Sequence, residues 1–179
     1  GSANRAFTLG PMLTHGAVHA LELTGSAAQK ARYLPKMVSG EWTGTMVLTE
    51  PQAGSDLGQV RTRAVPEGDH YRVFGQKIFI TWGDHDLTAN TIHMVLGRIE
   101  GAPSGVKGIS LFIVPKVLVN ADGSLGERND VALAGLFHKM GWRGIPSIAL
   151  NFGENGDCRG WLVGEKNQGI SNMFQMMNE

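Results

Sequence analysis

A short turn after an apolar run gives this chain its clearest candidate for a ligand site. The run Met46–Thr49 ends at Glu50-Pro51, and the turn that follows contains Gly54 and Ser55. Such a turn leaves backbone N–H groups unpaired, and a glycine lets the main chain approach a ligand closely because it has no side chain. These features suit a phosphate or the polar edge of a cofactor ring. An ordinary exit from a strand into a loop is the alternative that the same residues allow.

A second apolar run, residues 77–83, also carries groups that suit a cofactor. It is rich in β-branched and aromatic residues, as strands are, and it places the Thr81 hydroxyl next to the flat side chain of a tryptophan. Phe79 in the same run has the simpler interpretation of a core residue, because an aromatic side chain in a strand usually packs inside. Glu50 lies beside Pro51 at the end of a strand. That position favours a structural role, in which its carboxylate holds backbone N–H groups or a neighbouring cation, over a role as a catalytic acid.

Together the two runs resemble the acyl-CoA dehydrogenases, the flavoproteins that desaturate acyl thioesters. Members of that family carry a Leu-Thr-Glu-Pro-x-Ala-Gly-Ser-Asp run and, further along, an aromatic-Ile-Thr run. Two more stretches match in order: residues 29–41 resemble the helix and turn before the first strand, and residues 108–115 with 139–143 resemble later strands of the middle domain. The connection 120–130 is longer than usual in the family. It resembles the subgroup with larger insertions, which includes enzymes acting on methylthiopropionyl-CoA.

The resemblance implies a site for FAD. The matching residues are Met46, Val47, Leu48 and Thr49 at the pyrimidine edge of the flavin, Gly54 and Ser55 near the pyrophosphate, and Phe79, Ile80 and Thr81 behind the ring. Ser55 would also touch the pantetheine of the substrate, and the Thr81 hydroxyl would lie near flavin N5. Phe79 departs from the family pattern, which often has tryptophan at this position.

The resemblance also implies a reaction and partners. The substrate is an acyl-CoA thioester: a base removes its α proton while the β carbon gives a hydride to the flavin, and an enoyl-CoA remains. The family takes that base from a later helical domain, so no residue of this chain is assigned as catalytic. An electron-transfer flavoprotein or a similar acceptor would reoxidise the parent enzyme, which we expect to be a homo-oligomer.

The pattern along the chain divides it into three regions. Residues 1–42 have helical spacing, with a capping box at 26–29, and resemble the end of an N-terminal helical domain. Residues 43–163 change to short β runs separated by turns, which predicts a middle domain of antiparallel strands, as a barrel or sandwich. Residues 164–179 resemble the start of a C-terminal helical domain, and their apolar residues recur at helical spacing: Ile170, Met173, Phe174 and Met177. We therefore expect an α+β fold in which helices of incomplete N- and C-terminal helical domains flank the middle domain.

Several local elements can be named in advance. The expected strands are 61–65, 71–74, 78–81, 91–96, 109–114 and 148–152. Residues 100–108 and 120–130 are polar and contain glycine, so they are expected to be exposed connections. The last helix is still in its pattern at Glu179, which suggests a fragment of a longer protein. Its apolar stripe should self-associate, fold back on the strands, or be disordered.

Composition excludes several classes of function. The 179 residues include 16 basic and 16 acidic ones, so nothing indicates a nucleic-acid or membrane-surface partner. No apolar run approaches the roughly 20 residues that span a bilayer. The single cysteine, Cys158, permits neither an internal disulfide nor a cysteine-based zinc cluster, which favours a reducing compartment such as the cytoplasm. His15 and His19 have the spacing of metal ligands on a helix, but no third ligand is evident, so no metal site is expected.

Two classes of function remain open at this stage. The first is a fragment of an FAD-dependent acyl-CoA dehydrogenase. The second is a relative that keeps the flavin but has lost the dehydrogenase reaction and acts as a binding protein. A β-barrel interaction domain without a cofactor is a third, simpler alternative.

Overall fold

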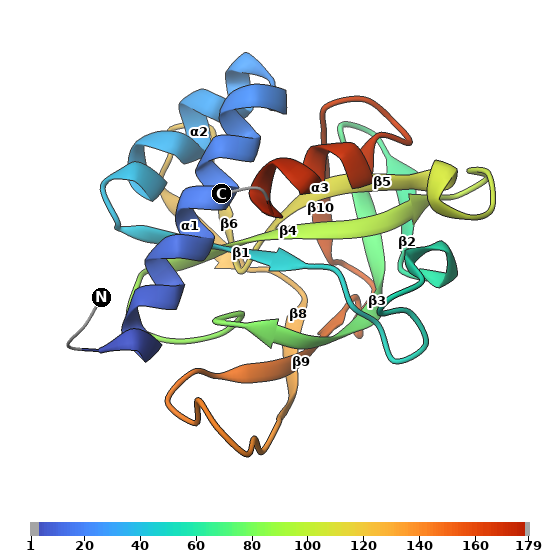
Figure 1. Ribbon diagram of the computed structural model, residues 1–179. Helices are drawn as coiled ribbons and strands as arrows, with labels where there is room; N and C mark the ends of the chain where they lie inside the picture. Colours follow the sequence, from blue (N-terminus) through green and yellow to red (C-terminus); the bar gives the residue numbers. More distant parts are fainter. Residues whose placement is uncertain (1–3, 178–179) are drawn as a thin grey trace.

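The computed structural model describes residues 4–177, which fold into helices packed against a sheet (Figure 1). The helices are α1 (Arg5–Thr24), α2 (Ala27–Val38) and α3 (Gly169–Met177), with two short 3-10 helices, η1 (Leu57–Gln59) and η2 (Val106–Gly108). The strands are β1 (Trp42–Val47), β2 (Arg63–Glu67), β3 (His70–Thr81), β4 (Asn90–Ile99), β5 (Ile109–Pro115), β6 (Val117–Val119), β7 (Leu125–Arg128), β8 (Val131–Leu136), β9 (Ser147–Phe152) and β10 (Arg159–Val163). The predicted α+β class, with a strand-rich middle region between helices, is confirmed.

The first two helices begin where side chains satisfy their free N–H groups. Asn4 accepts a hydrogen bond from the Phe7 N–H at 3.0 Å at the start of α1. The capping box predicted for α2 is present, because Ser26 Oγ accepts from the Gln29 N–H at 3.2 Å and Gln29 Oε1 accepts from the Ser26 N–H at 2.9 Å. These bonds replace the intrahelical partners that the first turn lacks.

The main sheet has the strand order β1-β4-β5-β10-β3-β9-β8, and β2 pairs with both β3 and β4. Most of these pairs are antiparallel, as predicted. The prediction is wrong for two of them, since β1 and β2 each run parallel to β4. Strands β2 and β3 lie between β1 and β4 in the sequence, so β1 pairs with a strand far along the chain. No short turn fixes the direction of such a pair.

Four strands were not expected from the sequence. Strand β7 lies inside the stretch 120–130, predicted to be an exposed connection, and pairs with β6 in a separate hairpin. All four residues of β7 are exposed, so it has no apolar alternation to reveal it. Strands β6, β8 and β10 likewise lacked a clear pattern. The predicted strands 71–74 and 78–81 are two ends of one strand, β3.

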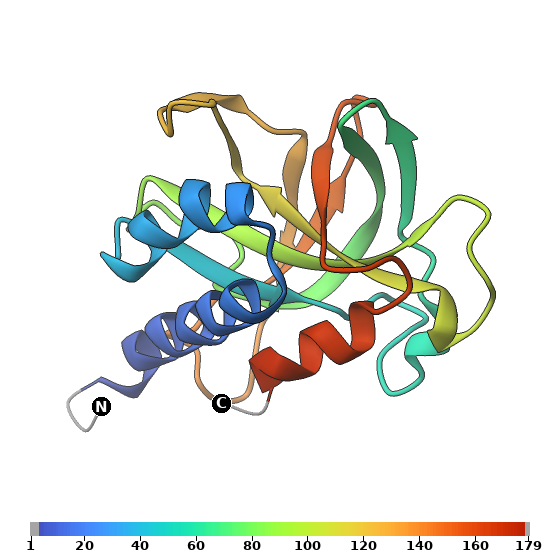
Figure 2. The ribbon, with the colours of Figure 1, turned by 90° about the horizontal axis from the view of Figure 1, so that it is seen from above.

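The core has two layers, one on each side of β4 and β5. In Figures 1 and 2, the three helices lie on one side of the sheet, and β2, β3, β8, β9 and β10 lie on the other. Alternate side chains of β4 therefore enter different clusters: Ile92, Met94 and Leu96 face the layer under the helices, whereas Val95 packs with residues of β3 and β9. Strands buried on both faces have nearly continuous apolar sequences, as β4 and β5 do.

Helix α3 folds back on the rest of the molecule, one of the outcomes expected for its apolar stripe. It packs on α1 and β5, and Met173 and Met176 are buried. Phe174 and Met177 are 46% and 51% exposed, so the predicted stripe is covered on one side only. The last two residues of the predicted C-terminal region lie outside the described residues.

Candidate functional site

The two runs singled out in the sequence lie side by side in the structure. The Ile78 N–H donates to the Thr49 carbonyl oxygen at 2.9 Å. The Thr45 hydroxyl donates to the Thr81 carbonyl oxygen at 2.6 Å. The end of β1 and the end of β3 are therefore joined at two points, and residues far apart in the sequence share one region of the surface.

The turn after β1 is closed at its base and open at its tip. Glu50 and Ala53 exchange two backbone hydrogen bonds, with N–O distances of 2.9 and 3.0 Å. Gly54 and Ser55 are exposed, and their N–H groups donate no hydrogen bond to another backbone group in the described part of the chain. A side chain at Gly54 would have only one atom within 4 Å, the Thr49 methyl group at 3.8 Å. The tip thus presents free donors beneath open space, as an anionic ligand needs.

Glu50 has the structural role that its sequence position predicted. Its carboxylate accepts hydrogen bonds from the N–H groups of Arg61 and Thr62, at 2.8 and 3.0 Å, and from the Thr62 hydroxyl at 2.6 Å. It also forms an ion pair with Lys77, with 2.9 Å between Nζ and Oε1. Burial raises the pKa of Glu50, but Lys77 and the hydrogen bonds from Thr62 and Arg61 outweigh it and lower that pKa to about 2. Glu50 is thus ionised, and both of its carboxylate oxygens already accept hydrogen bonds within the protein.

Phe79 lies on a bulge that turns its side chain out of the core. The pairing of β3 with β9 shifts between Lys77 and Ile80, and Phe79 between them has φ 57°. This left-handed conformation strains a bulky residue, and such residues concentrate at functional sites. The Phe79 ring is 58% exposed and lies 4.8 Å from the ring of Phe137, measured between centroids. The simpler interpretation, a core aromatic, is therefore wrong for Phe79.

The nine residues matched to the flavin differ in exposure. Gly54, Ser55 and Phe79 are exposed; Met46, Leu48, Thr49 and Thr81 are half-buried; Val47 and Ile80 are buried. The side chains of Val47 and Ile80 belong to the second core layer. Because their side chains point into the core, Val47 and Ile80 could contact a ligand on the surface only through their backbone atoms.

A small apolar hollow adjoins the end of β1. It has a volume of about 260 Å³ and is lined by Met12 and Leu13 of α1, Met46 of β1, and Met176 and Met177 of α3. Sequence reasoning did not bring these residues together, because three separate elements supply them. Methionine side chains are flexible and polarisable, so such a hollow can adapt to an apolar or thioether group.

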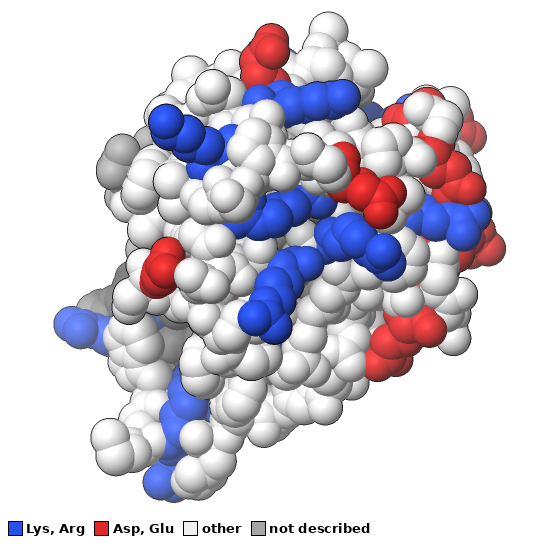
Figure 3. Space-filling model, turned by 90° about the vertical axis from the view of Figure 1, so that its right-hand side faces the viewer, with Lys and Arg blue, Asp and Glu red and all other residues white. Residues whose placement is uncertain are grey.

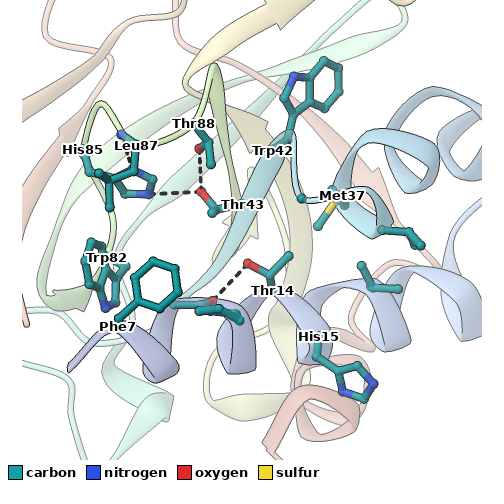
Figure 4. A pocket seen from close by; sticks show the side chains of 15 residues that line it. Phe7, Thr14, His15, Met37, Trp42, Thr43, Trp82, His85, Leu87 and Thr88 are labelled. Carbon is teal, nitrogen blue, oxygen red and sulfur yellow. Dashed lines mark hydrogen bonds between the residues drawn. The ribbon is translucent and has the colours of Figure 1, made fainter. Parts of the chain in front are cut away.

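A larger hollow lies on another face of α1 (Figure 4). Its volume is about 520 Å³, and α1, α2, the start of β1 and the loop after β3 supply its lining. At one edge Thr43 Oγ1 is 3.1 Å from His85 Nε2 and 3.2 Å from Thr88 Oγ1. None of the nine matched residues lines this hollow, so it is separate from the predicted site.

One face of the molecule is basic. Figure 3 shows Lys and Arg side chains across the middle of the face that carries η1 and β2, whereas Asp and Glu side chains lie mostly toward its edges. Arg61, Arg63 and Lys107 are exposed there. Arg98 is partly committed to structure, because its guanidinium donates to the carbonyl oxygens of Gly58 and Val60, both at 2.7 Å.

Comparisons with known proteins assign the family. The family model described as acyl-CoA dehydrogenase, middle domain, matches residues 45–154, more than half of the chain. The chain belongs to the acyl-CoA dehydrogenase family. Members of this family are FAD-dependent flavoproteins, in agreement with the resemblance seen in the sequence.

Individual relatives agree with this assignment. The chain is 51% identical over 177 residues to the 3-methylmercaptopropionyl-CoA dehydrogenase of Ruegeria pomeroyi, covering 98% of this chain and 30% of that protein. It is 49% identical over 174 residues to a butyryl-CoA dehydrogenase of Syntrophomonas wolfei, covering 93% and 28%. The crystal structure of a probable acyl-CoA dehydrogenase from Mycobacterium abscessus matches with a TM-score of 0.71 at 32% identity, covering 90% of this chain and 39% of that one. The chain thus spans about a third of the length of these relatives.

Other kinds of site find no support within residues 4–177. The described residues contain no group of three or more His, Cys, Asp or Glu side chains that could hold a metal ion. No helix in this range is long and apolar enough to cross a membrane.

Proposed function

We propose that this chain is the central part of an FAD-dependent acyl-CoA dehydrogenase, which oxidises an acyl-CoA thioester to the 2,3-enoyl-CoA. The observation that carries the proposal is the junction of the two matched runs, where Thr49 bonds to Ile78 and Thr45 bonds to Thr81. It creates one surface from the residues that the family uses for its flavin. The relatives that are named as dehydrogenases do not favour the alternative of a flavin protein without this reaction.

The residues present fit a flavin. The free N–H groups of Gly54 and Ser55 suit the pyrophosphate, and the backbone of Met46–Thr49 supplies polar groups for the pyrimidine edge. The bulge at Phe79 interrupts β3 just before Ile80 and Thr81, the two residues that would lie behind the ring together with Phe79. When bound, FAD supplies the acceptor for the hydride from the β carbon of the substrate. The residues of this chain orient the ring and exclude water from one face of it; the base that takes the α proton lies outside residues 4–177.

The substrate fits the hollow beside Met46 and the basic face. A volume of about 260 Å³ lined by methionines suits a short acyl chain or a thioether, such as the butyryl and 3-methylmercaptopropionyl groups in the names of the relatives. Phe174 and Met177 leave an exposed apolar strip on α3 beside it. The exposed side chains of Arg61 and Lys107 favour the phosphates at the other end of coenzyme A.

Further features belong to the same proposal. We assign residues 43–163 to the middle domain, and the pairing of β2 with both β3 and β4 supports a barrel there. The full-length protein is a cytoplasmic homo-oligomer that passes electrons to an electron-transfer flavoprotein or a similar acceptor. Ser55, at the exposed tip of the turn, contacts both the flavin and the pantetheine of the substrate.

Replacing Ser55 by tyrosine in the full-length protein tests the proposal. The larger side chain occupies the space over the tip of the turn, so the dissociation constant for FAD should rise at least about tenfold, equivalent to about 1.4 kcal/mol. Ser124→Tyr, in the exposed turn between β6 and β7, serves as the matched control and should leave FAD binding unchanged. Titration of flavin fluorescence with apoprotein measures both. A wild-type protein that purifies without flavin and cannot be reconstituted would contradict the proposal.

A further inference from the structure

Lys77 is a fully buried lysine at the point where the two flavin-facing runs meet. Its side chain has 0% exposure, whereas lysine is normally exposed unless it is paired. The ammonium group donates to the Leu48 carbonyl oxygen at 2.8 Å and to Glu50 Oε1 at 2.9 Å. One side chain of β3 thus reaches both the last residues of the first run and the turn that follows it.

The position of Lys77 along β3 makes this contact geometrically important. Lys77 pairs with Leu150 of β9 immediately before the bulge, and Phe79 follows two residues later. Leu48, which accepts from its ammonium group, is itself one of the residues matched to the flavin. The ammonium group therefore ties the base of the bulge to the end of β1, on which the other side of the flavin site is built.

Glu50 extends the same connection to the far end of the turn. Its carboxylate holds the N–H groups of Arg61 and Thr62, so residues 50–62 form a loop closed at its base. The tip of that loop carries Gly54 and Ser55. Lys77 thereby reaches, through Glu50, the free N–H groups proposed for the pyrophosphate.

Lys77 and Glu50 form an ion pair in which both side chains are buried. Burial lowers the pKa of Lys77, and the ion pair with Glu50 opposes this shift. Buried ion pairs commonly add no stability over uncharged side chains of the same size, whereas removing one partner is strongly destabilising. The pair fixes the distance and direction between β3 at Lys77 and the turn at Glu50.

The geometry points to Lys77 and Glu50 as positioning residues that set the spacing between the two sides of the flavin site. This inference rests on the proposed function. It goes beyond that function because both side chains are buried and away from the surface that would meet the flavin. Lys77 and Glu50 act through the backbone of Leu48, the loop 50–62 and the bulge at Phe79.

The test uses the full-length protein with Lys77→Met, and with the double change Lys77→Met and Glu50→Gln. The single change leaves a buried carboxylate without its cation and lowers the temperature of unfolding. The double change removes both charges and recovers part of that loss; recovery is incomplete because the new amide NH2 group cannot accept the hydrogen bond that Glu50 Oε2 accepts from the Arg61 N–H. FAD affinity should not recover with it: we expect a dissociation constant at least about tenfold above wild type in the double variant. The absorption bands of its bound flavin should also shift, because the ring contacts change.

The control is Arg72→Met on the same strand. Arg72 lies near the start of β3, far from the bulge, and forms an ion pair with Glu67 of β2. Arg72→Met therefore also removes an ion pair made by β3. It should leave the FAD dissociation constant within about twofold of wild type. If Lys77→Met does not fold, the FAD affinities of the double variant and of Thr62→Val test the positioning role instead. Thr62→Val removes one hydrogen bond to Glu50.

The outcomes separate the two proposals. A double variant that binds FAD as tightly as wild type, with an unchanged spectrum, would overturn the positioning role and leave the proposed function intact. A wild-type protein that binds no FAD would refute the proposed function itself. Equal loss of affinity in the double variant and in Arg72→Met would show a general effect of stability and would also overturn the inference.

Discussion

Replacing Gly44 by alanine should push β1 away from the helices. A methyl group at this position would lie 2.6 Å from the Ala17 Cβ atom and 2.8 Å from the Met37 Cε atom. Carbon atoms in contact are ordinarily about 3.5–4.0 Å apart, so α1 or β1 must move by about 1 Å. Overpacking of this kind costs about 1–3 kcal/mol. The change also strains the 3.0 Å hydrogen bond from the Gly44 N–H to Thr14 Oγ1.

Thermal and urea unfolding followed by circular dichroism measure this effect. Because 1 kcal/mol corresponds to about 2–4 °C in a chain of this size, the midpoint should fall by about 2–12 °C. Gly135→Ala is the matched control, since Gly135 also lies in a strand but a methyl group there meets nothing within 4 Å. That variant should equal or slightly exceed wild type, because alanine restricts the unfolded chain. Equal midpoints for the two variants would refute the argument from packing.

Two further predictions concern titratable groups. Burial lowers the pKa of His93, so the unfolded chain takes up a proton more readily than the folded one, and stability should decline as the pH falls below about 6.5. In urea titrations from pH 7.5 to 5, the free energy of unfolding should decline less for His93→Gln than for wild type. Replacing the exposed His138 by glutamine should leave the decline as in wild type. Parallel curves for all three proteins would contradict the role of His93. Burial also raises the pKa of the Cys158 thiol, so a thiol reagent at pH 8 should react only after denaturation. Rapid labelling of the folded chain would show that β10 opens readily.

The turn after β1 could be predicted from the sequence because its signals are local. The apolar run before Glu50-Pro51, and the proline itself, indicated both the end of β1 and the structural role of Glu50, and both predictions are confirmed. The start of α2 could also be predicted from the sequence, since a capping box needs only four consecutive residues. Such features depend on neighbours in the chain, and for that reason a single sequence reveals them.

Other parts of the site depend on partners that the sequence does not specify. Nothing near Lys77 indicates that it is buried, because its partner Glu50 comes from another strand end. The left-handed conformation of Phe79 contradicts local steric preference and exists only because β9 pairs on both sides of the bulge. The hollow beside Met46 needs three elements to meet. The parallel pairing of β1 with β4 is of the same kind, since only the folded sheet decides it.

The place of β10 in the sheet has a consequence for how the chain is made. Among the described residues this strand is the last along the chain, yet it lies between β5 and β3. The ribosome adds about 5–20 residues per second, so the 48 residues that follow Pro115 up to Val163 take roughly 2–10 s to synthesise. Throughout that interval β3 and β5 have exposed edges that can pair with other chains. Chains that stop before β10 has left the ribosome should therefore be captured by chaperones or aggregate, and chains in which β10 has emerged should escape both.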